Sequence, residues 1–232
     1  MRIFFSKSVP FSPSKDIASL KGTVILVTGG NSCLGEQSIL ELSKHKPVEI
    51  WLAARNANKA HEAIADVKRT IDLMSLDAVE NESYEIQFGT NYMGHALLTK
   101  LLLPILLKTA EQPASDVRVV LLSSLFHALK NRAEENGQSK LANILYGQEL
   151  ARRFPQLKVP IVHPGLVNYD VVQQLTSVFV GVDVETGTLN QLWASTSINV
   201  LSGGYYEPIG IMNRGSKYTK NKKLAKDLWE WT

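Results

Sequence analysis

The sequence is nearly free of cysteine, since Cys33 is the only one among 232 residues. No disulfide can form within such a chain, and a reducing compartment, here the cytoplasm, is expected. The sequence also lacks a long uninterrupted apolar run. Its apolar stretch Ala96–Leu107 contains Lys100 and Pro104 and is too short to span a bilayer. We interpret this stretch as a buried or subunit-facing helix and expect no membrane span.

Further absences exclude several function classes. The N-terminus lacks an apolar run long enough for a signal sequence. The net charge is only +3, and the basic residues near the C-terminus alternate with acidic ones without an aromatic-interleaved groove, so we expect a solvated face and no nucleic-acid partner. No metal site is predicted, because the histidines are scattered at spacings that do not suit metal ligation: His45, His61, His95, His127 and His163.

What the sequence does have is an alternation of strands and helices. The apolar runs Thr23–Gly30 and Val48–Arg55 are typical of buried parallel strands, and a helical pattern follows each of them. This alternation predicts an α/β domain with a parallel sheet, and the length predicts one domain over residues 1–232. The later expected elements are a helical region at 83–110, a strand at 116–124, a helix at 136–153, a strand at 158–165, a helix at about 185–196, a strand at 203–210 and a terminal helix.

The alternation fails between Arg55 and Ser83. Only 27 residues lie between them, and the helix after Asn56 uses about half of these residues. A complete passage of helix, strand, helix and strand needs about 35 residues or more. The sequence therefore predicts that one strand and its crossover are absent.

A glycine-rich segment, "TGGNSCLGEQ" at Thr28–Gln37, stands between the first strand and its helix. In that place a tight turn lets backbone N–H groups approach a pyrophosphate at the positive end of the helix. Because both the flanking strand and the helix are present, we favour dinucleotide binding over a simple turn.

Several segments in order along the chain resemble the short-chain dehydrogenase/reductase family, particularly its retinol-dehydrogenase-like and fungal light-induced alcohol dehydrogenase-like members. The segments are "TGGNSCLG", "WLAARN", "EIQFGTNYMGHALLTKLLLP", "VVLLSSLFH", "GQSKLANILYGQELARR" and "IVHPGLV". The resemblance implies a single domain with a Rossmann-type doubly wound parallel sheet, here without one central strand and crossover. It also implies hydride transfer between NADP(H) and a small-molecule carbonyl or alcohol substrate.

The resemblance assigns coenzyme-binding residues. Gly29, Ser32, Leu34 and Gly35 fall in the coenzyme turn, where Cys33 replaces the usual middle glycine and can crowd the approach of helix to strand. The other expected contacts are Arg55, Asp72, Asn91, Lys140, Pro164 and Gly165.

Arg55 bears on the choice of coenzyme. Members that use NAD carry an acidic residue after the second strand, where it bonds the ribose hydroxyls. An arginine instead offers a forked donor to a 2′-phosphate, so we expect NADP rather than NAD. The alternative is a surface arginine in a solvent-facing loop.

The family's catalytic residues are a tyrosine, a lysine four residues later, a serine and an asparagine. An ordinary phenol has a pKa near 10, and an adjacent ammonium group lowers it. By the resemblance, Ser124 takes the serine position, with Ser123 as the less favoured neighbour, Asn91 the asparagine position, and Lys140 the lysine position.

The tyrosine itself is missing, because Asn136 occupies its position and an amide has no proton that titrates near neutral pH. Tyr146 follows Lys140 by six residues and so points about 240° around the helix from it, which excludes a simple exchange. Either the chain is a decayed paralogue, or coding segments before Ser83 and before Asn136 are lost from this version of the gene.

Two function hypotheses remain open at this stage. The first is an NADP-dependent oxidoreductase with impaired turnover, and the second is a non-catalytic NADP-binding or partner-binding protein. A homodimer built through the long helices is expected from the family resemblance. A serine hydrolase that uses Ser124 is excluded by the absence of a G-x-S-x-G turn.

Overall fold

The computed structural model describes residues 8–54, 57–70, 78–79, 88–124, 134–165, 167, 182–212 and 215–232. The chain divides into two compact units. We call Phe11–Glu82 with Gly165–Thr196 the β1 unit, and Met1–Pro10 with Ser83–Pro164 and Ser197–Thr232 the β4 unit. The expectation of one domain over the whole chain stays a prediction.

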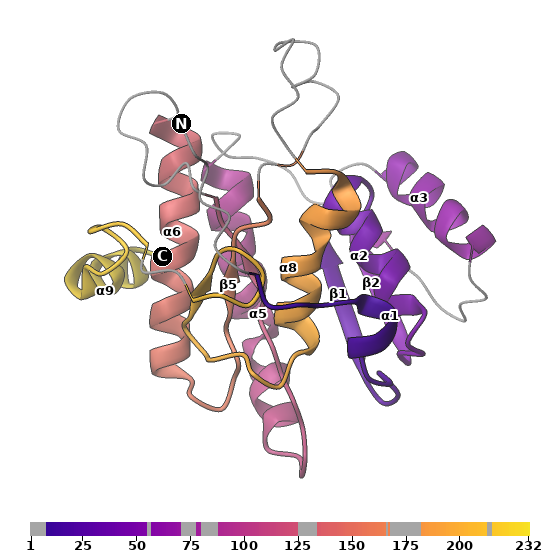
Figure 1. Ribbon diagram of the computed structural model, residues 1–232. Helices are drawn as coiled ribbons and strands as arrows, with labels where there is room; N and C mark the ends of the chain where they lie inside the picture. The colour runs from indigo at the N-terminus through magenta and orange to yellow at the C-terminus, as the bar shows by residue number, and fades with distance from the viewer. Residues whose placement is uncertain are drawn as a thin grey trace. The chain divides into compact units, whose positions relative to one another are not determined.

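The β1 unit contains a parallel sheet with the strand order β1-β2-β3. β1 pairs with β2 in a register that joins Val24 to Glu49 and Thr28 to Ala53. The helices around this sheet are also those that the sequence pattern predicts, apart from the short α1 (Figure 1). The elements are α1 (Pro13–Asp16), β1 (Val24–Thr28), α2 (Cys33–Ser43), β2 (Glu49–Ala53), α3 (Ala57–Thr70), β3 (Ala78–Val79) and α8 (Val184–Thr196).

The core of the β1 unit lies under α2 and α8, which run side by side (Figure 1). Ile39 of α2, Ile50 and Leu52 of β2, and Leu192 of α8 are at most 1% exposed and belong to one hydrophobic cluster. The two helices are also joined by a polar contact, because the Gln191 side chain donates a hydrogen bond to the Leu34 carbonyl over 3.0 Å.

One face of β1 carries exposed apolar side chains. Val24 is 61% exposed and Leu26 is 39% exposed, although β1 is an apolar run of the kind that normally lies buried. Within the described ranges, no strand pairs with β1 on the side away from β2. The prediction that the sheet lacks a central strand and its crossover stays a prediction, with which these exposed side chains agree.

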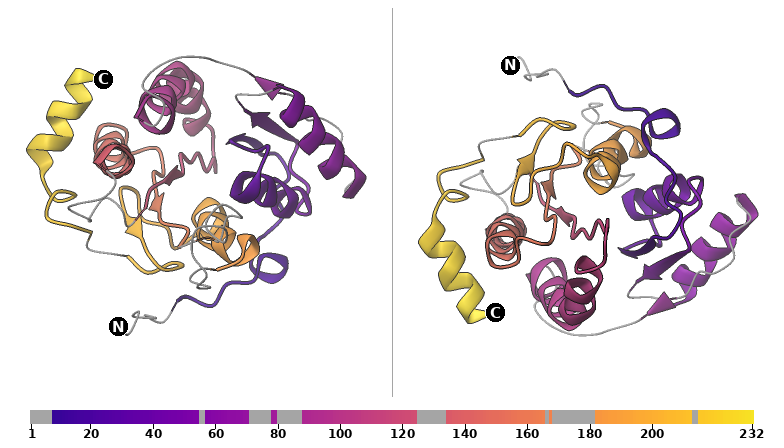
Figure 2. Two further views of the ribbon diagram at one scale, coloured as in Figure 1. Left: turned by 90° about the horizontal axis from the view of Figure 1, so that it is seen from above. Right: turned by 90° about the horizontal axis from the view of Figure 1, so that it is seen from below.

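The β4 unit contains a second parallel sheet with the order β4-β5-β6. Figure 2 shows α6 and α9 as neighbouring helices of this unit. The elements are a π-helical turn η1 (Gly89–Met93), α5 (Gly94–Ala110), β4 (Leu121–Leu122), α6 (Glu134–Arg153), β5 (Ile161–Val162), β6 (Tyr205–Tyr206) and α9 (Lys222–Trp231).

The strands of the β4 unit are shorter than the sequence predicts. Pro160 has no N–H group, so it cannot complete the ladder that the apolar runs 116–124 and 158–165 would otherwise form. Extended pairing nevertheless continues beyond the strands, since Val119 N–H donates to the Lys158 carbonyl over 2.9 Å and Ser123 N–H donates to the Val162 carbonyl over 2.8 Å.

The core of the β4 unit is well packed. Ile144 and Leu150 of α6 and Ile161 and Val162 of β5 have no exposed surface. An aromatic cluster joins α6 to α9 and η1: the rings of Tyr146 and Trp229 stack with centroids 5.2 Å apart, and Tyr92 meets Tyr146 edge-on at 5.8 Å.

Helix α5 departs from the expectation of a buried helix. Only Ala96 and Thr99 are buried along it, whereas Leu97, Leu101 and Ile105 are 50%, 70% and 61% exposed. The 22-residue helical stretch Gly89–Ala110, which includes η1, is long and apolar enough to cross a membrane by length and composition alone. The expectation that α5 is buried is therefore wrong, and the expectations that it faces a second subunit and spans no membrane stay predictions.

Candidate functional site

The glycine turn connects β1 to α2 in the β1 unit. Gly29 has a φ of +65°, and its N–H group donates a 2.7 Å hydrogen bond to the Ala53 carbonyl at the end of β2. Ser32 is the N-cap residue of α2, and its side chain makes no capping hydrogen bond. The first N–H groups of α2, together with the Ser32 hydroxyl, are thus donors suited to an anion at the helix N-terminus.

Gly35 is required for the shape of this turn. A Cβ atom at Gly35 would collide with the carbonyl oxygen of Gly29, so only glycine allows the helix to approach the strand this closely. Cys33 has a φ of +48°, a left-handed conformation that costs a non-glycine residue about 1 kcal/mol or more. Cys33, at the middle position of the turn, therefore adopts the left-handed backbone conformation that a glycine would adopt there without strain.

Leu34 contributes to the turn through packing. Its side chain is 7% exposed, and its carbonyl accepts hydrogen bonds from the side chains of Ser38 and Gln191. These contacts fix the first turn of α2 against α8. The cradle formed by Gly29, Ser32 and Gly35 fits a pyrophosphate group, because its donors are backbone N–H groups and one hydroxyl.

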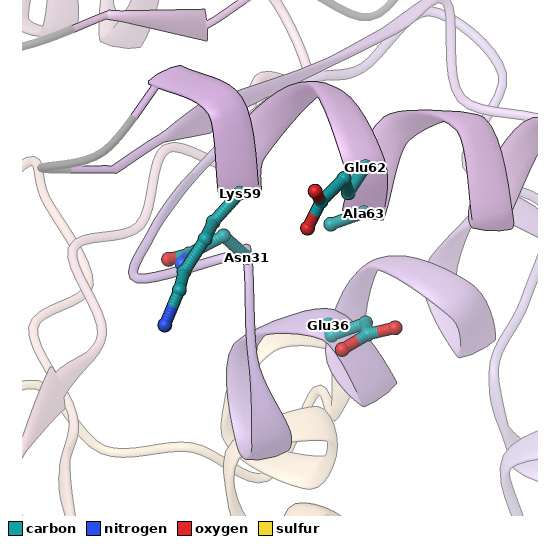
Figure 3. Close-up of a pocket in the computed structure, with 5 residues that line it drawn as sticks. All are labelled: Asn31, Glu36, Lys59, Glu62 and Ala63. Atoms are coloured by element: carbon teal, nitrogen blue, oxygen red, sulfur yellow. The ribbon is translucent and has the colours of Figure 1, made fainter.

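A small pocket lies between the glycine turn and α3 (Figure 3). Its volume is about 150 Å³. That is less than the 300–1,000 Å³ usual for ligand pockets, so it can hold only part of a dinucleotide. Lys59 lies beside Asn31 there, and Glu62 faces the same space. The lining residues are Asn31, Glu36, Lys59, Glu62 and Ala63. Arg55 and Asp72, the expected coenzyme contacts near the strand ends, lie outside the described residues.

The expected catalytic side chains lie in the β4 unit, where hydrogen bonds hold their elements together. Asn91 in η1 donates to the Ser139 hydroxyl of α6 over 3.2 Å. Ser123, at the end of β4, donates to the Lys140 carbonyl over 2.8 Å, and Asn143 donates to the Leu122 carbonyl over 3.0 Å. The structure thus joins η1, the carboxyl end of β4 and the first turns of α6.

Ser123 and Ser124 have different surroundings. Ser123 is 3% exposed and its hydroxyl is committed to the α6 backbone, whereas Ser124 is only half-buried. Ser124 is therefore the better placed of the two to meet a substrate, which is also the preference that the sequence gives. Its catalytic role stays a prediction, as do those of Asn91 and Lys140.

Lys140 is half-buried, and within the described ranges its ammonium group has no ion pair or hydrogen bond. Burial lowers the pKa of Lys140, because a low-dielectric environment disfavours the charged form. The pKa of His95 is also lowered, first by burial and further by the charge of Lys140. The two side chains therefore share one electrostatic environment.

Among the described residues, no buried tyrosine of the β4 unit has a pKa suited to the role of the phenol that the sequence is expected to lack. Burial raises the pKa of Tyr146 to about 12, and burial also raises the pKa values of Tyr92, Tyr205 and Tyr206. A catalytic tyrosine needs the opposite shift, towards neutral pH. Asn136 belongs to the first turn of α6, four residues before Lys140.

The segment after β5 carries the last two expected coenzyme contacts. Pro164 ends one part of the β4 unit, and Gly165, with a φ of +89°, begins the next part of the β1 unit. The preceding residue, His163, is 4% exposed and its N–H group donates to the Tyr206 carbonyl over 3.1 Å. The backbone here is thus anchored through β6.

Four residues of these sites escape the sequence interpretation: His95, Ser139, Asn143 and Lys59. His95 follows Asn91 by four residues on one helical stretch, and Ser139 directly precedes Lys140, so their spacing is a signal that could reveal them. Lys59 has no such signal, because it reaches the pocket only through the packing of α3. Within the described parts of the chain, no group of three metal-ligating side chains gathers.

Comparisons with known proteins agree with this geometry. A short-chain dehydrogenase/reductase of Armillaria gallica is 29% identical over 283 residues, which covers 93% of this chain and 91% of the relative. Mouse retinol dehydrogenase 12 is 26% identical over 275 residues, covering 90% and 85%. A solved Escherichia coli short chain dehydrogenase complexed with NADPH has a TM-score of 0.68 at 16% identity and covers 83% of this chain and 99% of its own. No protein-family model matches the chain.

The fold is the α/β fold of solved short-chain dehydrogenases. The curated proteins that the chain resembles over nine tenths of its length are a short-chain dehydrogenase/reductase and a retinol dehydrogenase. The alignment with the Armillaria protein spans 283 residues, more than the 232 residues of this chain. The relative therefore carries stretches that have no counterpart here, in line with the absent strand.

Proposed function

We propose that the chain binds NADP(H) at its glycine turn and descends from an oxidoreductase of small or lipophilic carbonyls and alcohols, with turnover lost or strongly reduced. The observation that carries the proposal is the environment of Lys140. The lysine is retained and half-buried, but the residue four positions earlier is Asn136, which has no titratable proton near neutral pH.

The choice of NADP over NAD rests on basic side chains near the end of β2. The sequence places Arg55 directly after that strand, and Lys59 lines the adjoining pocket. An arginine and a lysine together favour a 2′-phosphate over a bare ribose hydroxyl. When bound, the coenzyme supplies the hydride at its nicotinamide ring. Gly29, Ser32 and Gly35 would hold its pyrophosphate.

The roles of the β4-unit residues follow from their chemistry. The Ser124 hydroxyl would donate a hydrogen bond to the substrate oxygen, and Asn91 would hold the approach of η1 to α6 through Ser139. Lys140 would place a positive charge beside the reacting oxygen. With Asn136 in the tyrosine position, proton transfer has no donor of suitable pKa, and general acid–base catalysis typically contributes 10²–10⁴-fold to a rate.

The experiment combines coenzyme titration with a turnover assay. We expect NADPH to bind more tightly than NADH, and Gly35→Ala to weaken that binding at least about tenfold because the added methyl group would strike Gly29. Gln37→Ala, on the same helix, is the matched control and should bind as the parent does. Equal binding of NADPH by Gly35→Ala would contradict the placement of the coenzyme.

Turnover is tested by restoring the phenol. We expect no measurable reduction of a panel of aldehydes and ketones by the parent chain, and a measurable rate for Asn136→Tyr. Gln138→Tyr, an exposed position on the same helix, controls for the mere addition of a tyrosine. Turnover by the parent chain would refute the assignment of Asn136. Binding of NADPH without turnover by either variant would favour a non-catalytic NADP-binding protein.

The expected partners follow from the same family. We propose that two copies associate through the exposed apolar face of α5, which carries Leu97, Leu101 and Ile105, and that the protein works in the cytoplasm, where Cys33 stays reduced. A dimer in sedimentation analysis that dissociates on Leu101→Lys would support the pairing.

A further inference from the structure

We propose that Gln191 of α8 is a positioning residue for the coenzyme turn, and that it holds the first turn of α2 in the shape that a pyrophosphate needs. This role rests on the proposed function, because NADP(H) is the ligand that the turn is assigned there. Gln191 acts through the backbone of α2 and not by contact with the coenzyme.

The side-chain amide of Gln191 reaches the start of α2 from the neighbouring helix α8 (Figure 1). Its Nε2 group donates a hydrogen bond to the Leu34 carbonyl over 3.0 Å and another to the Ser38 hydroxyl. The Ser38 hydroxyl in turn donates to the same Leu34 carbonyl over 2.6 Å. All three residues are at most 7% exposed, so these bonds lie in a low-dielectric environment, where they are stronger than in water.

The Leu34 carbonyl belongs to the same peptide group as the N–H of Gly35. Because a peptide group is planar, hydrogen bonds that fix this carbonyl also fix the direction of the Gly35 N–H group. That N–H group donates to the Ser32 carbonyl over 3.2 Å, within the turn that we assign to the pyrophosphate. The amide of Gln191 therefore sets the geometry of the turn from the neighbouring helix.

The turn needs this restraint because one of its residues is strained. Cys33, which directly precedes Leu34, has a φ of +48°. A non-glycine residue keeps such a conformation only where the surrounding structure over-determines it. The two side-chain hydrogen bonds to the Leu34 carbonyl supply that restraint on the next residue of the chain.

The other end of the Gln191 amide contributes nothing comparable. Among the described residues, the buried Oε1 atom of Gln191 has no hydrogen-bond partner. A buried acceptor without a partner lowers the stability of a fold, and an apolar side chain of the same shape would avoid that loss. Stability alone therefore does not account for a glutamine at this position, whereas its Nε2 donor at the coenzyme turn does.

The test uses Gln191→Met, which keeps the approximate length and volume of the side chain but removes its donor. We expect this variant to bind NADPH about fivefold more weakly than the parent chain, the effect of one lost hydrogen bond, without a lower urea midpoint of unfolding. Titration of NADPH fluorescence measures the affinity. Unchanged affinity, with or without a lowered midpoint, would overturn the proposal.

Thr188→Val is the matched control for the loss of a buried polar group from α8. The Thr188 side chain is fully buried, and its hydroxyl donates to the Val184 carbonyl within the same helix. This variant should bind NADPH as the parent does. A loss of affinity equal to that of Gln191→Met would overturn the proposal, because it would assign the effect to the helix as a whole.

Amide hydrogen exchange separates this role from the proposed function. Measured by NMR without coenzyme, the Gly35 N–H should exchange about fivefold faster in Gln191→Met than in the parent, and at the parent rate in Thr188→Val. Faster exchange in a chain that binds no NADPH would refute the proposed function and support the role of Gln191 in the turn. An unchanged exchange rate would overturn that role. Gln191→Asn, whose amide is one methylene group too short to reach Leu34, serves for the same measurements if the methionine variant does not fold.

Discussion

Strands β1 and β5 have similarly apolar sequences, but β1 is largely exposed and β5 is buried. Ile161 and Val162 of β5 have no exposed surface, whereas Val24 of β1 is 61% exposed and Leu26 is 39% exposed. β5 has a neighbouring strand on each side in its sheet, whereas among the described residues β1 has one neighbour, β2. The apolar composition of β1 is typical of a strand that is covered on both faces, which its described surroundings do not provide.

The largest expected difference between the two strands is in hydrogen exchange. We expect the amide protons of Ile161 and Val162 to exchange at least about a hundredfold more slowly than those of Val24–Val27, because opening an edge strand disrupts fewer contacts. Exchange measured by NMR or mass spectrometry checks this expectation. Equal protection of the two strands would mean that β1 is covered in solution.

A matched pair of truncations should sharpen the comparison. Val162→Ala removes two buried methyl groups and should lower the free energy of unfolding by about 2 kcal/mol, from lost burial and the cavity left behind. Val24→Ala makes the same chemical change on the exposed face and should cost less than about 0.5 kcal/mol. Urea unfolding monitored by circular dichroism measures both values. A cost of Val24→Ala close to that of Val162→Ala would break the comparison.

The β1 unit should gain stability at its glycine turn. Cys33→Gly relieves the left-handed backbone conformation and should raise the free energy of unfolding by about 1 kcal/mol. Ser32→Gly is the matched control, because Ser32 has an extended backbone and gains nothing from glycine. Thermal or urea unfolding measures the change in the free energy of unfolding for both variants. A loss of stability in Cys33→Gly would show that the cysteine side chain contributes more than its backbone costs.

The smallest expected effect concerns the ion pairs of Asp116, which precedes β4 in the β4 unit. Hydrogen bonds from Arg118, and then from Lys158, hold the pKa of Asp116 at about 2. Because the folded pKa lies below the ordinary value, the ionised group stabilises the fold above about pH 4, and this stability is lost as the pH falls towards 2. Asp116→Asn should therefore cost about 0.2–1 kcal/mol at pH 7, since the group is partly exposed, and almost nothing at pH 2. Unfolding curves at both pH values test the sign.

Much of the fold could be predicted from local pattern. The β1, α2, β2, α3 order and the helix at α6 follow from apolar periodicity, and their observed bounds agree with the expected ones to within a few residues. The strand lengths around Pro160 could not be predicted from apolar content, because one missing N–H group interrupts a ladder that composition favours. The exposure of Leu101 on α5 also depends on tertiary neighbours, which a periodic pattern does not specify.

The candidate site could also be predicted only in part, because some of its features depend on tertiary contacts. The family resemblance brings Asn136, Lys140 and the serines near β4 to attention. Hydrogen bonds join Ser123 to the Lys140 carbonyl and Asn91 to Ser139, so the structure brings the elements that carry these residues together. The left-handed conformation of Cys33 could not be read from the sequence, since cysteine rarely adopts it. The shared environment of His95 and Lys140 needs two elements in contact, which only the fold supplies.

The π-helical turn η1 has a consequence for insertions and deletions. A π turn accommodates one more residue than an α turn, and each residue of an α-helix advances by about 100°. Deleting one residue from Gly89–Met93 would convert the wide turn to a regular α turn, and the helix after it would keep Ala96 and Thr99 on its buried side. Deleting one residue after Gly94 instead would turn the rest of α5 by about 100° and carry Lys100 into the position of Thr99. The wide turn is thus the place in this helical stretch where a change of length is absorbed locally.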